Sequence, residues 1–324
     1  MAIHQPSALV VALAVPLLAL ALPLPLHAQT VEALVQALAK APSLDDEAIG
    51  DGGIQSETWK AFVALRTRAS KDELVALLAH GSPIVRGYAC RALMDTQPKA
   101  DWPNLLAARA SDAATVITFE GCIRGERRLG DVVLEWARDR KLLSDEQWLD
   151  LAEAMVKGKS PLLARDEMLR TVRFRPGMRD VLRALAQGGD GAAHVALARY
   201  GDIRDLPVLT LWLSRANAFD DSSAFVAAQA FADPSLLPVL IDGEAKARAA
   251  IAAGRMGIVR EWLSAIAVHK SHAASTFLAR FLADAPADAA RRELVQAMKG
   301  VLVPFGADPV FAEVREVLVR LARR

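Results

Sequence analysis

Cysteine and net charge are both scarce in this chain. It has 2 cysteines among 324 residues, which excludes a small fold held together by many disulfides. Its 39 Lys and Arg are balanced by 38 Asp and Glu, for a formal net charge of +1. The whole-chain field therefore does not predict binding to nucleic acid. With 53% hydrophobic residues and so little net charge, the chain is also not disordered.

Strand signals are missing as well. We find no β-branched run that alternates with polar residues, and tyrosine occurs only at positions 88 and 200. Helix signals recur instead, as capping boxes, serines before a proline, and aspartates that precede an apolar run. These predicted caps are Ser70, Ser82, Ser144, Ser160, Asp190 and Asp221. The pattern predicts about seventeen or eighteen helices, most of roughly 10–15 residues.

The N-terminal segment is almost wholly apolar from Ala8 to Leu26, and the first charged residue is Glu32. Such a run followed by the small residue Ala28 predicts a secretory signal peptide over residues 1–28, cleaved near Ala28. The protein is then expected to be periplasmic or secreted, without membrane association after cleavage. The alternative is a retained membrane anchor, because the run approaches the length that spans a bilayer. Prolines at positions 16, 23 and 25 oppose a stable spanning helix.

An internal repeat organises the second half of the chain. Residues 196–209 and 227–240 match at a constant offset of 31 residues, and both end in Leu-Pro-Val-Leu. The offset also pairs Tyr200 with Phe231 and Asp202 with Asp233. A looser copy covers residues 82–106. A fixed period of this length predicts a solenoid, in which each unit buries its apolar face against its neighbours.

Helix pairs of about 31 residues resemble HEAT-type repeats, in particular the short variety of the phycobilisome lyases. Residues 81–93 and 199–209 carry this resemblance. It implies an all-α fold, an α-solenoid of stacked antiparallel helix pairs, as a single domain over residues 29–324. HEAT-type arrays are usually scaffolds and protein-binding surfaces, so the resemblance implies a fold rather than an activity. No catalytic motif of an enzymatic member is matched.

Cys90 and Cys122 are 32 residues apart, close to one repeat. We expect each of them late in a helix, beside a small residue. In an exported protein such a pair predicts a disulfide that joins two successive units. Stacked helices lie roughly 8–10 Å apart, whereas a disulfide needs Cα atoms within about 7 Å. The alternative is therefore two buried thiols that pack as small apolar side chains.

A local cluster of arginines lies within residues 121–128 and is reinforced by Arg138, Arg140 and Lys141. Arg124, Arg127 and Arg128 are the candidate residues for binding an acidic partner or a phosphate. Carboxylates such as Glu126 and Glu135 interleave with them. Mixed charge at helical spacing is also typical of a solvated helix face with i, i+4 ion pairs, and this is the alternative.

Other chemistry-bearing residues favour structural roles. The spacing of His269 and His272 suits zinc, but Ser271 between them is typical of a helix N-cap. The glycine-rich segment 49–56 lacks the strand and the Lys-Ser/Thr pair of a phosphate-binding loop, which favours a loop leading into a helix at Ser56. The 6 tryptophans are spread along the chain, which favours core packing. We therefore predict no catalytic residues, no metal site and no cofactor.

Three classes of function follow from the sequence, and the third, assembly with a membrane complex, requires that the N-terminal segment is retained. The first is a non-catalytic module that binds or scaffolds another protein, because solenoids present long surfaces to partners. The alternative is an enzyme or a small-ligand carrier whose site lies in the concave groove of the solenoid.

Overall fold

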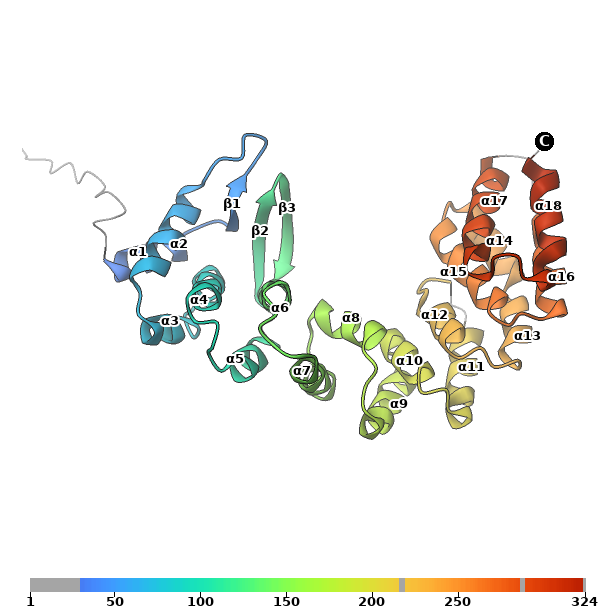
Figure 1. Ribbon diagram of the computed structural model, residues 1–324, viewed down its shortest axis with the longest axis horizontal. Coiled ribbons are helices and arrows are strands. Elements are labelled where there is room, and N and C mark those ends of the chain that lie inside the picture. The colour runs from blue at the N-terminus through green and yellow to red at the C-terminus, as the bar shows by residue number, and fades with distance from the viewer. Residues whose placement is uncertain (1–29, 216–218, 286–288, 323–324) are drawn as a thin grey trace, which may run out of the picture. The chain divides into compact units, whose positions relative to one another are not determined.

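The computed structural model describes residues 30–215, 219–285 and 289–322, so the predicted signal peptide lies outside the described residues (Figure 1). The chain divides into two compact units. The first comprises the chain up to Thr96 together with Ile117–Gly125, and the second comprises Gln97–Val116 and the chain from Glu126 onward. The single domain predicted for residues 29–324 stays a prediction.

The first unit combines short helices with most of a small sheet. Its helices and first strand are α1 (Val31–Ala39), β1 (Leu44–Ile49), α2 (Glu57–Arg68), α3 (Lys71–Leu77) and α4 (Pro83–Thr96). The other two strands are β2 (Thr115–Gly121) and β3 (Ile123–Arg128), and the chain passes between the units within each of them.

The second unit is helical apart from the ends of β2 and β3, and the chain as a whole is mostly helical. Its first helices are α5 (Trp102–Arg109), α6 (Leu129–Asp139), α7 (Asp145–Lys157), α8 (Leu163–Thr171), α9 (Arg179–Gln187), α10 (Gly191–Ala198) and α11 (Leu206–Ser214). They are followed by α12 (Ser223–Ala230), α13 (Leu236–Ile241), α14 (Glu244–Ala252), α15 (Met256–Ala267), α16 (His272–Ala283), α17 (Ala289–Leu302) and α18 (Ala312–Ala322). Single 3₁₀ turns are η2 (Pro176–Met178), η3 (Ile203–Asp205), η4 (Val303–Phe305) and η5 (Pro309–Phe311).

The three-stranded sheet, in the order β1-β2-β3, corrects the expectation of a purely helical chain. β1 runs parallel to β2, with Leu44 opposite Thr118 and Asp45 opposite Phe119. Because β1 reads Leu-Asp-Asp-Glu-Ala-Ile, it has no apolar alternation to mark it as a strand. Hydrogen bonds from a residue of α4 hold β1 in place instead. The Tyr88 hydroxyl accepts the amide N–H of Asp45 at 2.7 Å and donates to the Asp45 carbonyl at 3.2 Å.

Four of the six predicted helix caps are confirmed. Ser70 and Ser144 form capping boxes with Glu73 and Gln147, Asp190 caps α10, and the Ser82 hydroxyl accepts the amide N–H of Val85 in α4 at 3.5 Å. These caps are readable from the sequence because each one depends on residues within the same turn. The residue at the N-cap of α12 is Ser222 rather than the predicted Asp221, which accepts the amide N–H of Ser223 at 2.9 Å.

The internal repeat corresponds to two successive helix pairs. Residues 196–209 cover the end of α10, η3 and the start of α11, and residues 227–240 cover the end of α12 and most of α13. α10 packs against α12, and α11 packs against α13. Asp202 and Asp233 each turn the chain between the helices of a pair by accepting the amide N–H two residues later. The repeated sequence therefore marks repeated local structure.

The predicted core role of tryptophan is confirmed for the tryptophans at positions 59, 102, 212 and 262, which are buried. Trp262 is wholly buried at the centre of the C-terminal core and donates from its indole N–H to the Leu240 carbonyl at 2.8 Å. Trp136 and Trp148 are only half-buried.

Candidate functional site

Cys90 and Cys122 do not form the predicted disulfide. Cys90 is buried in α4, whereas Cys122 is exposed at the turn between β2 and β3. The prediction is wrong because it assumes that Cys122 lies in a helix, at the position that corresponds to Cys90 one repeat earlier. Cys122 lies in a hairpin turn instead, so the two cysteines do not occupy corresponding positions. The alternative of buried thiols holds for Cys90 alone.

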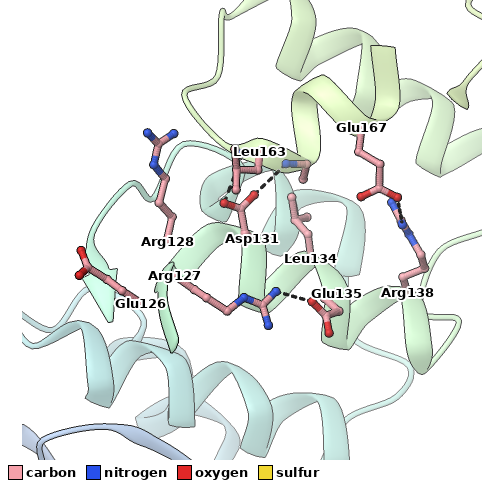
Figure 2. A pocket seen from close by; sticks show the side chains of 10 residues that line it. Glu126, Arg127, Arg128, Asp131, Leu134, Glu135, Arg138, Leu163 and Glu167 are labelled. Carbon is pink, nitrogen blue, oxygen red and sulfur yellow. Dashed lines mark hydrogen bonds and ion pairs between the residues drawn. The ribbon is translucent and has the colours of Figure 1, made fainter. Parts of the chain in front are cut away.

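The candidate arginines lie on β3 rather than on a helix, so the helix-face alternative is wrong. Side chains alternate between the two faces of a strand, and Figure 2 shows Arg127 and Arg128 pointing in different directions. Arg127 pairs with Glu135 of α6, while no carboxylate in the described chain pairs with Arg128. Arg124 is exposed and belongs to the first unit. The structure therefore brings only Arg127 and Arg128 to a common site.

A close backbone approach positions this site where β3 passes into α6. A Cβ atom on Gly130, the second residue of α6, would lie 2.5 Å from Cδ1 of Leu162 and 2.7 Å from the carbonyl oxygen of Arg109. Real Cβ atoms do not approach other atoms this closely, so the position requires glycine. Gly130 thereby lets α6 pack directly against the segment that leads into α8.

α8 begins at Leu163, and the predicted cap at Ser160 is wrong. The Ser160 hydroxyl donates instead to the Ala110 carbonyl at 2.5 Å. The first turn of α8 is capped by Asp131 of α6, whose buried carboxylate accepts the amide N–H of Ala164 at 2.8 Å and that of Leu163 at 3.3 Å. A carboxylate suits this position because the amides at a helix N-terminus lack partners and carry partial positive charge.

A cavity of about 430 Å³ opens beside this junction and is lined by residues of β3, α6 and α8 (Figure 2). Leu134 lies buried in its wall, and Leu163 is 70% exposed on its rim. Arg127 and Arg128 line it together with Glu135. The cavity therefore has an apolar interior and a rim with charges of both signs.

A second cavity, of about 800 Å³, adjoins the first. It lies between the end of α6, the start of α7 and the outer face of α8, and Lys141, Trp148 and Met168 are among its lining residues. Arg138 and Glu167 line both cavities. We refer to the two cavities together as the α6–α8 groove.

Arg138 occupies the middle of the groove. Its guanidinium donates to the Glu167 carboxylate at 2.8 Å, as Figure 2 shows, and lies 5.7 Å from the centroid of the Trp148 ring. Both members of this ion pair are about half exposed, and such pairs typically contribute only about 0–1 kcal/mol. A bound partner can therefore separate Arg138 from Glu167 at a low cost in free energy and form its own ion pair with each of them.

The sequence indicates Arg138 only as a reinforcement of the arginine cluster and Trp148 only as a core residue, and it gives no indication of Glu167. Each is a charged or aromatic residue on an amphipathic helix, which by itself indicates nothing beyond a half-exposed face. The one available signal was the 29-residue separation of Arg138 and Glu167, close to the repeat period.

The histidines do not come together with other possible metal ligands in the described part of the chain. Among residues 30–215, 219–285 and 289–322, no group of three His, Cys, Asp or Glu side chains is arranged to hold a metal ion. His269 lies in the turn after α15, and Ser271 caps α16 as predicted, so the two histidines of that pair lie on either side of a cap. His194 is buried and stacks on Trp212, with ring centroids 4.3 Å apart.

Over the same described residues, no helix has both the length and the apolar character needed to cross a bilayer. Comparisons of the chain with protein-family models, with curated proteins and with solved structures find no match for it.

Proposed function

We propose that this protein is an exported helical-repeat protein that binds a partner protein in the α6–α8 groove. The observation that carries the proposal is the junction of two cavities, of about 430 and 800 Å³, across a single half-exposed ion pair. A groove of this kind offers apolar space for side chains of a partner and charged rims that select among partners.

The residues of the groove are of the types that dominate binding energy at protein interfaces. Tryptophan and arginine are enriched among such residues, and Arg138 lies over Trp148 at the point where the cavities meet. Leu163 adds an apolar side chain that is 70% exposed. A large exposed leucine next to an apolar cavity is favourable to bury, at about 25 cal/mol for each Å² removed from water.

The repeat architecture and the export signal belong to the same proposal. Two helix pairs related by the 31-residue offset pack in succession, which supports a HEAT-like solenoid over residues 29–324. The apolar run from Ala8 to Leu26 supports export to the periplasm or the medium. The mass of the intact exported protein tests the signal, because cleavage near Ala28 removes about the first 28 residues, whereas a retained anchor leaves the full mass.

The binding proposal is tested by affinity capture from the native compartment with two matched variants. Leu163→Glu places a charge at the rim of the groove, and Leu211→Glu makes the same change at a leucine of α11 that is 59% exposed and does not line it. We expect one protein to be captured by the unchanged chain and by Leu211→Glu, but not by Leu163→Glu. Equal capture by all three chains would refute binding in the groove.

A second candidate function is carriage of a small ligand. The larger cavity favours it, because about 800 Å³ lies within the usual range of ligand sites. Native mass spectrometry of the exported protein distinguishes the two. A stoichiometric small molecule that Trp148→Ala releases supports the carrier, and its absence alongside a Leu163-dependent protein partner supports the binding module.

A further inference from the structure

The two walls of the α6–α8 groove carry opposite charge. The wall made by β3 and α6 carries four cations and three carboxylates. The carboxylates are those of Glu126, Asp131 and Glu135, and the cations are Arg127, Arg128, Arg138 and Lys141. Asp131 is already used within the fold, because its oxygens accept the first amides of α8. With four cations and three carboxylates, this wall has a net charge of +1.

The wall made by α7 and α8 is negative. Its charged lining residues in the described chain are Asp145 and Glu167, and no lysine or arginine of these two helices lines either cavity. A partner element that lies along the groove thus meets cations on one flank and carboxylates on the other. An element with a single sign of charge on both flanks would place like charges together on one wall, which is unfavourable at an interface.

The spacing of the cavities limits the kind of element that fits. Along α8 the first cavity spans residues 163–167 and the second spans 167–172. Their midpoints are therefore roughly four to five residues apart, or about 7 Å along the helix axis. Side chains at positions i and i+4 of a partner helix are separated by about 6 Å along its axis, so one side chain can enter each cavity.

In an extended segment, the side chains on one face also repeat at a similar distance, but such a segment matches the charges of the two walls less well. Its intervening side chain points away from the groove, because side chains of a strand alternate between opposite faces. A helix instead presents residues on both flanks of its apolar stripe, where they reach Arg138 on one wall and Glu167 on the other.

We infer that the partner element is an amphipathic helix with an apolar pair at i and i+4, acidic residues on the flank that faces α6 and basic residues on the flank that faces α8. The inference rests on the proposed protein-binding function and gives its partner a chemistry. When the helix docks, the Arg138–Glu167 ion pair is replaced by two ion pairs with the partner, and the two apolar side chains fill the cavities on either side.

Three synthetic helical peptides test the inference against the full exported chain. All three carry the same leucine pair; one has glutamates on one flank and lysines on the other, one has glutamates on both flanks, and one has lysines on both. We expect the first peptide to bind about tenfold more tightly than either of the others in isothermal titration calorimetry, since each single-sign peptide creates like-charge contacts on one wall.

A charge reversal in the protein provides the second arm. Glu167→Lys makes the α8 wall positive, so we expect the peptide with glutamates on both flanks to become the tightest binder. Glu316→Lys is the matched control, because Glu316 is exposed on α18 and lines neither cavity. It should leave the original order of the three peptides unchanged.

The outcomes separate this inference from the proposed function. Equal affinities of the three peptides, or an order that Glu167→Lys does not change, would overturn the charge assignment. If no peptide binds while capture of the native partner still depends on Leu163, the helix is wrong and the binding groove stands. If capture does not depend on Leu163, both are wrong.

Discussion

The carboxylate of Asp131 in α6 accepts the amide N–H of Ala164 in α8 at 2.8 Å, across a separation of 33 residues. The same carboxylate reaches the amide of Leu163 at 3.3 Å. One side chain therefore both starts α8 and fixes that helix beside α6. This contact joins α6 to α8, and each of these helices forms part of one wall of the α6–α8 groove.

Asp131→Ala should lower the free energy of unfolding by about 1–2 kcal/mol, the typical cost of losing a helix N-cap. The loss arises because two partly buried amides at the start of α8 lose their hydrogen-bond acceptor. Urea denaturation followed by circular dichroism measures it. Asp139→Ala on the same helix is the control, because Asp139 is exposed, and it should change the stability by less than about 0.5 kcal/mol. Equal effects of the two substitutions would contradict the capping role.

Gly130→Ala and Gly300→Ala should have effects of opposite sign. A methyl group at position 130 meets Leu162 and a backbone carbonyl within 2.7 Å, so we expect a loss of about 3 kcal/mol from overpacking. No atom lies within 4 Å of a Cβ at position 300, where alanine should stabilise α17 by up to about 1 kcal/mol. Thermal unfolding of both variants checks the pair, and a stable Gly130→Ala protein would argue against the close approach of α6 to Leu162.

Lys141 and Lys159 follow the ends of α6 and α7 with φ of 51° and 50°, in the left-handed region that glycine favours. Replacing either lysine by glycine should therefore stabilise the protein by about 1 kcal/mol. The two variants differ in binding, because Lys141 lines the groove and Lys159 does not. Titration of the native partner should show weaker binding for Lys141→Gly alone. Equal affinities of the two variants would remove Lys141 from the positive wall.

The stability of the protein should fall as the pH is lowered from 7 to 5. Burial lowers the pKa of His194 below its ordinary value, because desolvation disfavours the charged ring, and the pKa of His269 is lowered by the same cause. The unfolded chain then binds protons at a pH where the folded chain does not, so acid favours unfolding. His194→Phe retains a ring against Trp212 and removes one of the two groups. Its unfolding free energy should depend less steeply on pH than that of the unchanged protein. An unchanged slope would mean that His194 is not held neutral.

The helix caps and the internal repeat could be predicted because they depend on residues close together in the chain. Ser70, Ser144 and Asp190 each satisfy amides one turn away, and the 31-residue offset carries the same local turn twice. The groove could not be predicted in this way. The sequence marks Arg127 and Arg128 as charged residues, but their partners and their strand conformation depend on elements far along the chain.

The sequence by itself determined a mostly helical protein, its repeat and several of its helix starts, because these follow from propensity, periodicity and local hydrogen bonding. Only the tertiary structure decided the sheet, the start of α8 and the α6–α8 groove. β1 has no strand pattern and is held by Tyr88, and α8 is capped by Asp131 rather than by Ser160. In both places a hydrogen bond from the buried side chain of a distant residue outweighs the local signal, because a buried polar group must find a partner wherever the fold supplies one.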